Sequence, residues 1–232
     1  DAGRASLLPY LSRAGRNTVP VWPVPHGVHL RALAAEDKAF PPETPGAPPY
    51  FICLGTIEAR KNHLLLLNLW RRLVEKHGAR APRLIIIGKR GWENEQVLDM
   101  IERSPALHSV VEEHNALPDT EVVRLLRGAR ALLFPSFSEG FGLPLAEALA
   151  LKTPVICSDI PVFREVGGRA AHYLDPLDGL GWLRIIEGFS NLATREEILP
   201  GALDEDHILN WDQSIKRALR EIESFAQNAP RR

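Results

Sequence analysis

Two glutamates that flank a glycine-containing segment are the strongest candidates for chemistry in this sequence. Glu139 and Glu147 stand eight residues apart, and the second lies about one turn into a helix predicted from Pro144 onward. Backbone N–H groups at a helix start attract an anion or a polyol, and a carboxylate beside them suits a vicinal diol such as a ribose. The alternative is that Glu139 is an exposed acid of a loop and Glu147 an ordinary surface residue of the helix. The residues between Glu139 and that helix are Gly140, Phe141, Gly142 and Leu143.

Two adjacent cations form a second candidate group. Arg60 and Lys61 follow a short apolar run that ends at Gly55, and Asn62 is a possible N-cap for the helix that comes next. A cation and a helix dipole together would compensate the charge of a diphosphate. The alternative is a solvated basic turn.

The common nucleotide and hydrolase motifs are missing from the sequence. No GxxxxGK[ST], GxSxG or HExxH stretch occurs, and the GxGxxG fingerprint is met only halfway, at Gly140-Phe141-Gly142. The run Asp204-Glu205-Asp206 matches a D-x-D pattern by its letters, and we interpret it as solvated acid in a polar loop. We therefore expect neither a dinucleotide site nor a metal site.

Short apolar strands alternate with amphipathic helices, which predicts an α/β, Rossmann-like parallel sheet with helices on both faces. Ligands of such sheets bind beyond the carboxyl ends of the strands. The predicted strands are Tyr50–Leu54, Leu84–Ile87, His108–Glu112, Ala131–Phe134, Val155–Cys157 and Ala170–Leu174. One helix is predicted between Asn62 and Gly78. The other predicted helices are Glu95–Ile101, Asp119–Arg127, Pro144–Leu151 and about 161–166, 177–190 and 211–226.

Composition narrows the class of protein further. The 28 Lys+Arg and 29 Asp+Glu give a net charge of -1, so nucleic acid is not an expected partner. The aliphatic runs are too short to span a bilayer. Cys53 and Cys157 lie in apolar strands and are interpreted as buried thiols in a reducing compartment. The proline-spaced run Val19–Pro25 predicts an edge strand or an extended linker, and Phe40–Pro49 a loop or hinge.

Several segments, in the right order, resemble the glycosyltransferases of family GT4, which have the GT-B fold. The Glu139–Glu147 segment closely resembles the E-x7-E signature of that family. Phe51–His63 is similar to its first strand and phosphate-binding loop, in the variant of mannosyltransferase-like members. The other matching segments are Leu84–Trp92, Pro154–Pro161, the crossover-like Val24–Val28, and Trp211-Asp212 at the start of the last helix.

The resemblance implies a retaining, metal-independent transfer of a hexose from a nucleotide-diphosphate sugar, with GDP-mannose preferred. It places the diphosphate on Lys61, with Arg60 in place of an arginine that the family has where this chain has Thr56. Glu139 would bind hydroxyls of the transferred sugar and Glu147 the ribose, and the amides of residues 140–143 would contact the sugar and the distal phosphate. Further donor contacts are expected from Gly55, Thr56, Gly88, Lys89, His114 and Asn115, although His114 also fits a surface histidine without a partner. Trp92 is interpreted as a packing residue, and His26, His63 and His172 as structural or solvated.

The resemblance also implies that this chain is the C-terminal, donor-binding half of a two-domain enzyme. Residues 1–25 are similar to the end of the N-terminal domain and the interdomain crossover, 26–210 to the nucleotide-sugar-binding domain, and 211–232 to the C-terminal helix. An acceptor glycan or lipid-linked sugar would bind through the missing domain. A cytoplasmic protein is expected, with peripheral contact to the inner face of a membrane left open. The alternative function is a non-catalytic nucleotide-sugar-binding or regulatory module.

Overall fold

The computed structural model describes residues 2–17, 19–28, 48–191 and 208–228. Within them six strands form one sheet in the order β3-β2-β1-β4-β5-β6, and every paired strand is parallel. The strands are β1 (Tyr50–Leu54), β2 (Arg83–Ile87), β3 (Val111–His114), β4 (Leu132–Phe134), β5 (Val155–Ser158) and β6 (His172–Leu174). The predicted parallel α/β architecture is therefore confirmed.

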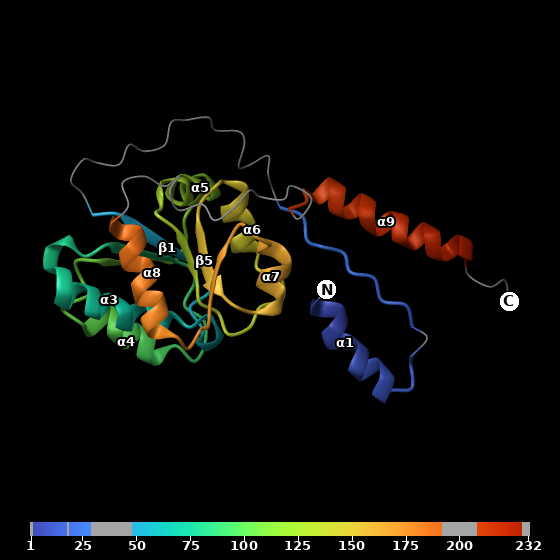
Figure 1. Ribbon diagram of the computed structural model, residues 1–232, viewed down its shortest axis with the longest axis horizontal. Helices are drawn as coiled ribbons and strands as arrows, with labels where there is room; N and C mark the ends of the chain where they lie inside the picture. Colours follow the sequence, from blue (N-terminus) through green and yellow to red (C-terminus); the bar gives the residue numbers. More distant parts are fainter. Residues whose placement is uncertain (1, 18, 29–47, 192–207, 229–232) are drawn as a thin grey trace.

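Helices cover both faces of this sheet (Figure 1). Alternate residues of the central strands face opposite ways, so that Phe51 and Cys53 enter one core cluster while Ile52 and Leu54 enter the other. One face packs against α3 (His63–His77), α4 (Glu95–Arg103) and α8 (Gly179–Asn191). The opposite face packs against α5 (Asp119–Gly128), α6 (Leu143–Ala150) and α7 (Pro161–Gly167).

The strand order places a topological switch point between β1 and β4. The chain runs outward from β1 to β2 and β3, returns to β4 beside β1, and then continues to β5 and β6. A crevice forms at such a point, because the loops after the two central strands leave the sheet in opposite directions. The loop after β1 carries Arg60 and Lys61, and the loop after β4 carries Glu139. The fold thus brings together the two groups of candidate residues.

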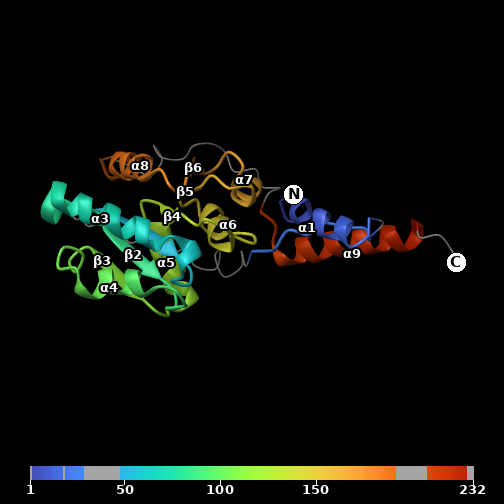
Figure 2. The same cartoon turned by 90° about the horizontal axis from the view of Figure 1, so that it is seen from below.

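An arm of separate elements lies to one side of the sheet (Figure 2). It contains α1 (Ala2–Arg13), the extended residues 19–27 and α9 (Trp211–Asn228). Trp22 packs edge-on against Phe225 at 5.2 Å between ring centroids, and Val28 pairs with Asn210 in an isolated parallel bridge. The proline-spaced run is thus an extended linker, the second of its two predicted forms.

Most strand and helix boundaries differ from the sequence prediction by one or two residues, and those of β3 by up to three. β3 spans Val111–His114 rather than His108–Glu112, and its register is set by pairing with β2, Leu84 opposite Val111 through Ile87 opposite His114. α6 begins at Leu143, one residue before Pro144. Most of Phe40–Pro49 lies outside the described residues. No helix of the described part combines the length and apolar character that crossing a membrane requires.

Candidate functional site

A buried ion pair joins the loops after β1 and β4. The Lys61 Nζ lies 2.5 Å from the Glu139 Oε1, and both side chains are almost completely shielded from solvent. Ser136 donates a further hydrogen bond of 2.8 Å to the same carboxylate oxygen. Lys61 is therefore not part of a solvated turn: its ammonium group is held at the switch point by a carboxylate from the neighbouring loop.

Arg60 extends this pair into a line of alternating charges. Its Nη1 lies 3.0 Å from the Glu139 Oε2 and donates a 2.9 Å hydrogen bond to the Ser138 carbonyl. Its Nη2 lies 2.7 Å from the Oε1 of Glu58, whose residue is only 3% exposed. The backbone N–H of Phe137 donates to the Arg60 carbonyl at 2.8 Å, so backbone and side chains both fix the two loops against each other.

The local sequence explains how Lys61 reaches this place. Gly55 has a φ of +135°, a backbone conformation that residues with a side chain rarely adopt. A Cβ at this position would meet the Lys61 Cε and Nζ at 3.4 Å. The Lys61 ammonium lies 5.0 Å from the centre of the Phe134 ring, a cation–π contact. The lysine therefore runs along the end of β1 between a glycine and an aromatic ring.

Asn62 ends the loop differently from the sequence prediction. It precedes α3, but its backbone is left-handed (φ 57°) and its side chain makes no capping hydrogen bond. The Nδ2 donates instead to the carbonyls of Pro135 at 3.2 Å and Pro176 at 3.1 Å. The predicted N-cap position of Asn62 is confirmed, but its side chain does not cap the helix, because this amide ties α3 to two other loops.

The start of α6 provides the N–H groups expected for anion binding. Gly142 has a φ of +91°, and a Cβ there would meet the Phe163 ring at 2.9 Å, so only glycine fits. The first N–H groups of a helix have no partner within it. Gly140 faces open space, whereas the Phe141 ring packs edge-on against His26 at 5.1 Å. Leu143 is exposed, and Glu147 is half-buried one turn further along.

The loop after β2 approaches the loop after β1 more closely than any side chain would allow. A Cβ on Gly88 would lie 1.9 Å from the Gly55 carbonyl oxygen, and one on Gly91 would lie 2.7 Å from the Thr56 Cγ2. The Gly88 N–H donates to the His114 carbonyl at 2.9 Å, and the Ile57 N–H donates to the backbone carbonyl of Lys89 at 2.8 Å. The Lys89 residue itself is exposed. Gly88 and Thr56 thus serve loop packing in this structure.

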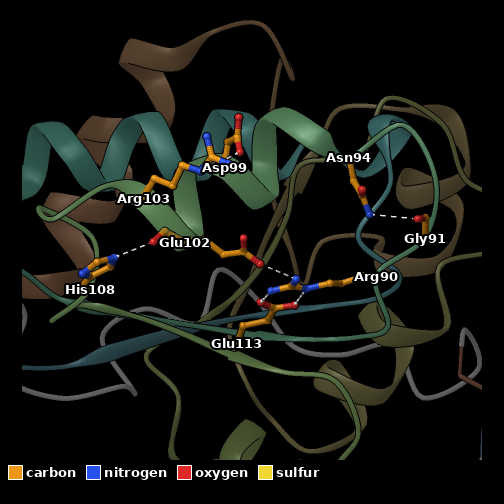
Figure 3. A network of polar contacts seen from close by, with 8 residues as sticks. All are labelled: Arg90, Gly91, Asn94, Asp99, Glu102, Arg103, His108 and Glu113. Carbon is orange, nitrogen blue, oxygen red and sulfur yellow. Dashed lines mark hydrogen bonds and ion pairs between the residues drawn. The ribbon is translucent and has the colours of Figure 1, made fainter.

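A polar network fixes the same loop to β3 and α4 (Figure 3). The Arg90 guanidinium donates to both carboxylate oxygens of Glu113 at 2.7 Å and to one oxygen of Glu102 at 2.6 Å. These hydrogen bonds raise the pKa of Arg90. Asn94 donates to the carbonyls of Ile57 at 2.9 Å and Gly91 at 3.1 Å. Sequence reasoning missed both residues, because neither stands in a motif.

The remaining candidate residues lie around this edge of the sheet. His114 ends β3 and is half-buried with its Nε2 3.8 Å from the Glu112 Oε2, so it has an acidic neighbour, and Asn115 is exposed. Trp92 is 68% exposed, and its interpretation as a packing residue was wrong. Among the described residues no cluster of His, Cys, Asp or Glu could hold a metal ion, and Asp204–Asp206 lie outside them.

The comparison with protein families shows which family this chain belongs to. The family described as "Glycosyl transferases group 1" matches residues 35–172, more than half of the chain. The chain belongs to this family. The resemblance drawn from the E-x7-E segment and the phosphate-binding loop is thereby confirmed.

Curated relatives of this group 1 glycosyltransferase chain match it over most of its length. It is 33% identical over 186 residues, 80% of the chain, to the serotype-specific mannosyltransferase WbdA of Escherichia coli. It is 37% identical over 172 residues, 73% of the chain, to the O-antigen chain mannosyltransferase B of the same species. The chain spans 22% and 44% of the lengths of these two curated relatives.

Solved structures share the fold of this group 1 chain at low sequence identity. A glycosyltransferase from Rickettsia africae matches with a TM-score of 0.71 and 16% identity over 89% of this chain and 57% of its own. A UDP-forming α,α-trehalose-phosphate synthase from Burkholderia vietnamiensis matches with a TM-score of 0.72 and 13% identity, over 99% of this chain and 59% of its own. These neighbours confirm the α/β Rossmann-like fold.

Proposed function

We propose that this chain is the donor-binding part of a retaining, metal-independent glycosyltransferase. It transfers a hexose from a nucleotide-diphosphate sugar to an acceptor, with mannose from GDP-mannose as the preferred donor. The observation that carries the proposal is the buried Lys61–Glu139 pair, 2.5 Å apart at the switch point of a group 1 glycosyltransferase sheet. The preference for mannose rests on two relatives whose names are mannosyltransferases.

In this proposal Lys61 and the N-terminus of α6 hold the diphosphate. The ammonium group is pre-positioned in a shielded site, where each charge-assisted hydrogen bond is worth roughly 1.5–3 kcal/mol. Its positive charge stabilises the negative charge that grows on the leaving diphosphate as the glycosidic bond breaks. Arg60 is half-exposed beside Glu139 and supplies the second cation. Both cations are already oriented, so little reorganisation is needed during transfer.

Glu139 has two tasks in this proposal. It orients Lys61 and Arg60 through its two carboxylate oxygens, and it accepts hydrogen bonds from hydroxyls of the transferred sugar. It is not a covalent nucleophile. The acceptor attacks from the face that the leaving phosphate occupies, and a phosphate oxygen takes the acceptor proton, which retains the anomeric configuration.

The nucleoside extends from the diphosphate across the same edge of the sheet. Glu147, half-buried one turn into α6, accepts the ribose hydroxyls. The base lies over the loops after β2 and β3, where Gly88, Lys89, His114 and Asn115 are found. An acceptor glycan or lipid-linked sugar, an N-terminal domain that binds it and a cytoplasmic location at the membrane face complete the proposal.

Calorimetric titration of the chain with GDP, UDP and ADP tests the proposal. We expect saturable binding of one nucleoside diphosphate, weakened at least about tenfold by Lys61→Met and by Glu147→Gln, because each removes a charge-assisted contact. Lys76→Met is the matched control, since Lys76 makes a comparable 2.7 Å ion pair with Glu187 away from the site. Failure of all three nucleotides to bind, or equal binding by Lys61→Met, would contradict the proposal.

A further inference from the structure

A cavity of about 390 Å³ opens beside the proposed donor site, between the starts of α3 and α4. Its walls include Glu58, Asn62, His63, Glu93, Asn94 and Phe137. The volume lies within the range of roughly 300–1,000 Å³ that is typical of small-molecule sites. Arg60 links the cavity to the donor site, because its guanidinium contacts Glu58 on one side and Glu139 on the other.

His63 is an unpartnered polar side chain in the wall of this cavity. The residue is 1% exposed, and neither ring nitrogen has a hydrogen-bond partner. Burial and the nearby Lys61 charge lower its pKa to about 4, so the ring is neutral near pH 7 and offers one donor and one acceptor. Buried polar groups in folded proteins are nearly always hydrogen-bonded, so these two nitrogens point to a ligand that is polar and uncharged.

The cavity walls are held rigidly. Asn94 is buried and spans to the Ile57 and Gly91 carbonyls, as its contact with Gly91 in Figure 3 illustrates. Asn62 and Glu93, at φ of 57° and 52°, hold left-handed backbone conformations, which asparagine tolerates and which are costly for glutamate. A rigid, pre-formed cavity lowers the entropy that a ligand loses on binding.

The chemistry of the walls selects the class of ligand. The Glu58 and Glu93 carboxylates accept hydrogen bonds and repel anions, which favours a neutral ligand over a second phosphate group. Phe137 lies on the rim with 44% of its surface exposed and its backbone fixed to the Arg60 carbonyl. An aromatic face beside convergent polar groups suits a ring with one apolar face and several hydroxyls.

We propose that this cavity binds a neutral saccharide unit of the acceptor. The inference rests on the proposed function, because the cavity matters for transfer only if the donor binds beside it, at Lys61, Arg60 and Glu139. It gives the donor-binding domain a share in choosing the acceptor: hydroxyls donate to the carboxylates of Glu58 and Glu93, His63 completes the hydrogen bonds, and Phe137 covers the apolar face of the sugar ring.

Methyl α-D-mannopyranoside is the probe for this cavity, and NMR of the chain with 13C-labelled histidine reports its binding. We expect a saturable shift of the His63 imidazole signal, which His63→Gln identifies. Phe137→Ala and Glu93→Gln should each weaken the binding at least about fivefold. Trp92→Ala also removes an exposed aromatic ring, but Trp92 lies outside the cavity wall. The affinity of this variant for the mannoside should therefore stay within about twofold of the parent chain's.

Parallel GDP titrations separate this inference from the proposed function. Phe137→Ala should bind GDP within about twofold of the parent chain, because its side chain is exposed outside the ion-pair line. A parent chain that binds GDP but shows no mannoside effect overturns the inference alone, and one that binds neither overturns both. A mannoside effect that survives both cavity variants and is lost in Glu139→Gln places the sugar at the donor position and also overturns the inference.

Discussion

Removing the Lys61 charge should destabilise the fold far more than removing a similar charge at the surface. Lys61 and Glu139 are both shielded from solvent, so Lys61→Met leaves a buried carboxylate without its nearest cation. Loss of one partner from a buried pair costs about 3–5 kcal/mol. Glu139 keeps Arg60 and Ser136, which places the expected loss of unfolding free energy near the lower limit, at about 3 kcal/mol.

The matched control is Lys76→Met. Its 2.7 Å pair with Glu187 has similar chemistry, but the lysine side chain is 62% exposed. Exposed ion pairs contribute about 0–1 kcal/mol, so the control should lose less than about 1 kcal/mol. Urea denaturation followed by circular dichroism measures both variants, and equal m-values would show that the same unfolding transition is compared.

A double-mutant cycle isolates the pair itself. Lys61→Met with Glu139→Gln removes both charges, so the double variant should lose less stability than the sum of the single losses, by about 1–3 kcal/mol. Additive losses, or a Lys61→Met loss no larger than that of Lys76→Met, would refute the view that Glu139 holds a buried lysine at the switch point.

Three further predictions follow from the same structure. Gly88→Ala should lower the unfolding free energy by more than about 2 kcal/mol, because the new Cβ would lie 1.9 Å from a backbone carbonyl oxygen. Gly140 faces open space, so Gly140→Ala should change the unfolding free energy by less than about 0.5 kcal/mol. Urea denaturation of both variants measures the difference. The pKa of His63 falls from about 6.5 in the unfolded chain to about 4 in the fold, so the unfolded state binds more protons between these values and stability falls as the pH drops through them. We expect a loss on the order of 2–3 kcal/mol between pH 7 and pH 4.5 that His63→Leu largely removes, and an unchanged pH profile in that variant would contradict it. Burial raises the pKa of Cys53 to about 12 and that of Cys157 as well, so both thiols should react with a thiol reagent at pH 8 only after unfolding; fast labelling of the native chain would count against their burial.

Hydrophobic patterning predicted the sheet well where strands are buried on both faces. Leu84–Ile87 is a continuous apolar run, and the observed β2 differs from it by one residue. β3 was misplaced because it is an edge strand with only half-buried side chains, two of them glutamates, so its position depends on pairing with β2 rather than on its own apolar content.

The site was predictable in its parts but not in its contacts. Spacing and resemblance selected Lys61 and Glu139 separately, while their ion pair depends on two loops that are 78 residues apart in sequence. Glu58 was missed because its burial is not readable from the sequence, although its partner, the Arg60 side chain, is near. Arg90 and Asn94 were missed because their partners lie far away in sequence: Arg90 contacts carboxylates of α4 and β3, and Asn94 contacts a carbonyl of the β1 loop. Asn62 was placed correctly at the N-cap position of α3, but local sequence does not reveal the two proline carbonyls that its side-chain amide contacts.

The most direct test of the central claim is a crystal structure of the chain with GDP bound. We predict phosphate oxygens within hydrogen-bond distance of the Lys61 Nζ and of the N–H groups at the start of α6, with the ribose hydroxyls on the Glu147 carboxylate. A nucleotide bound away from the β1 and β4 loops, or phosphates without contact to Lys61, would contradict the account.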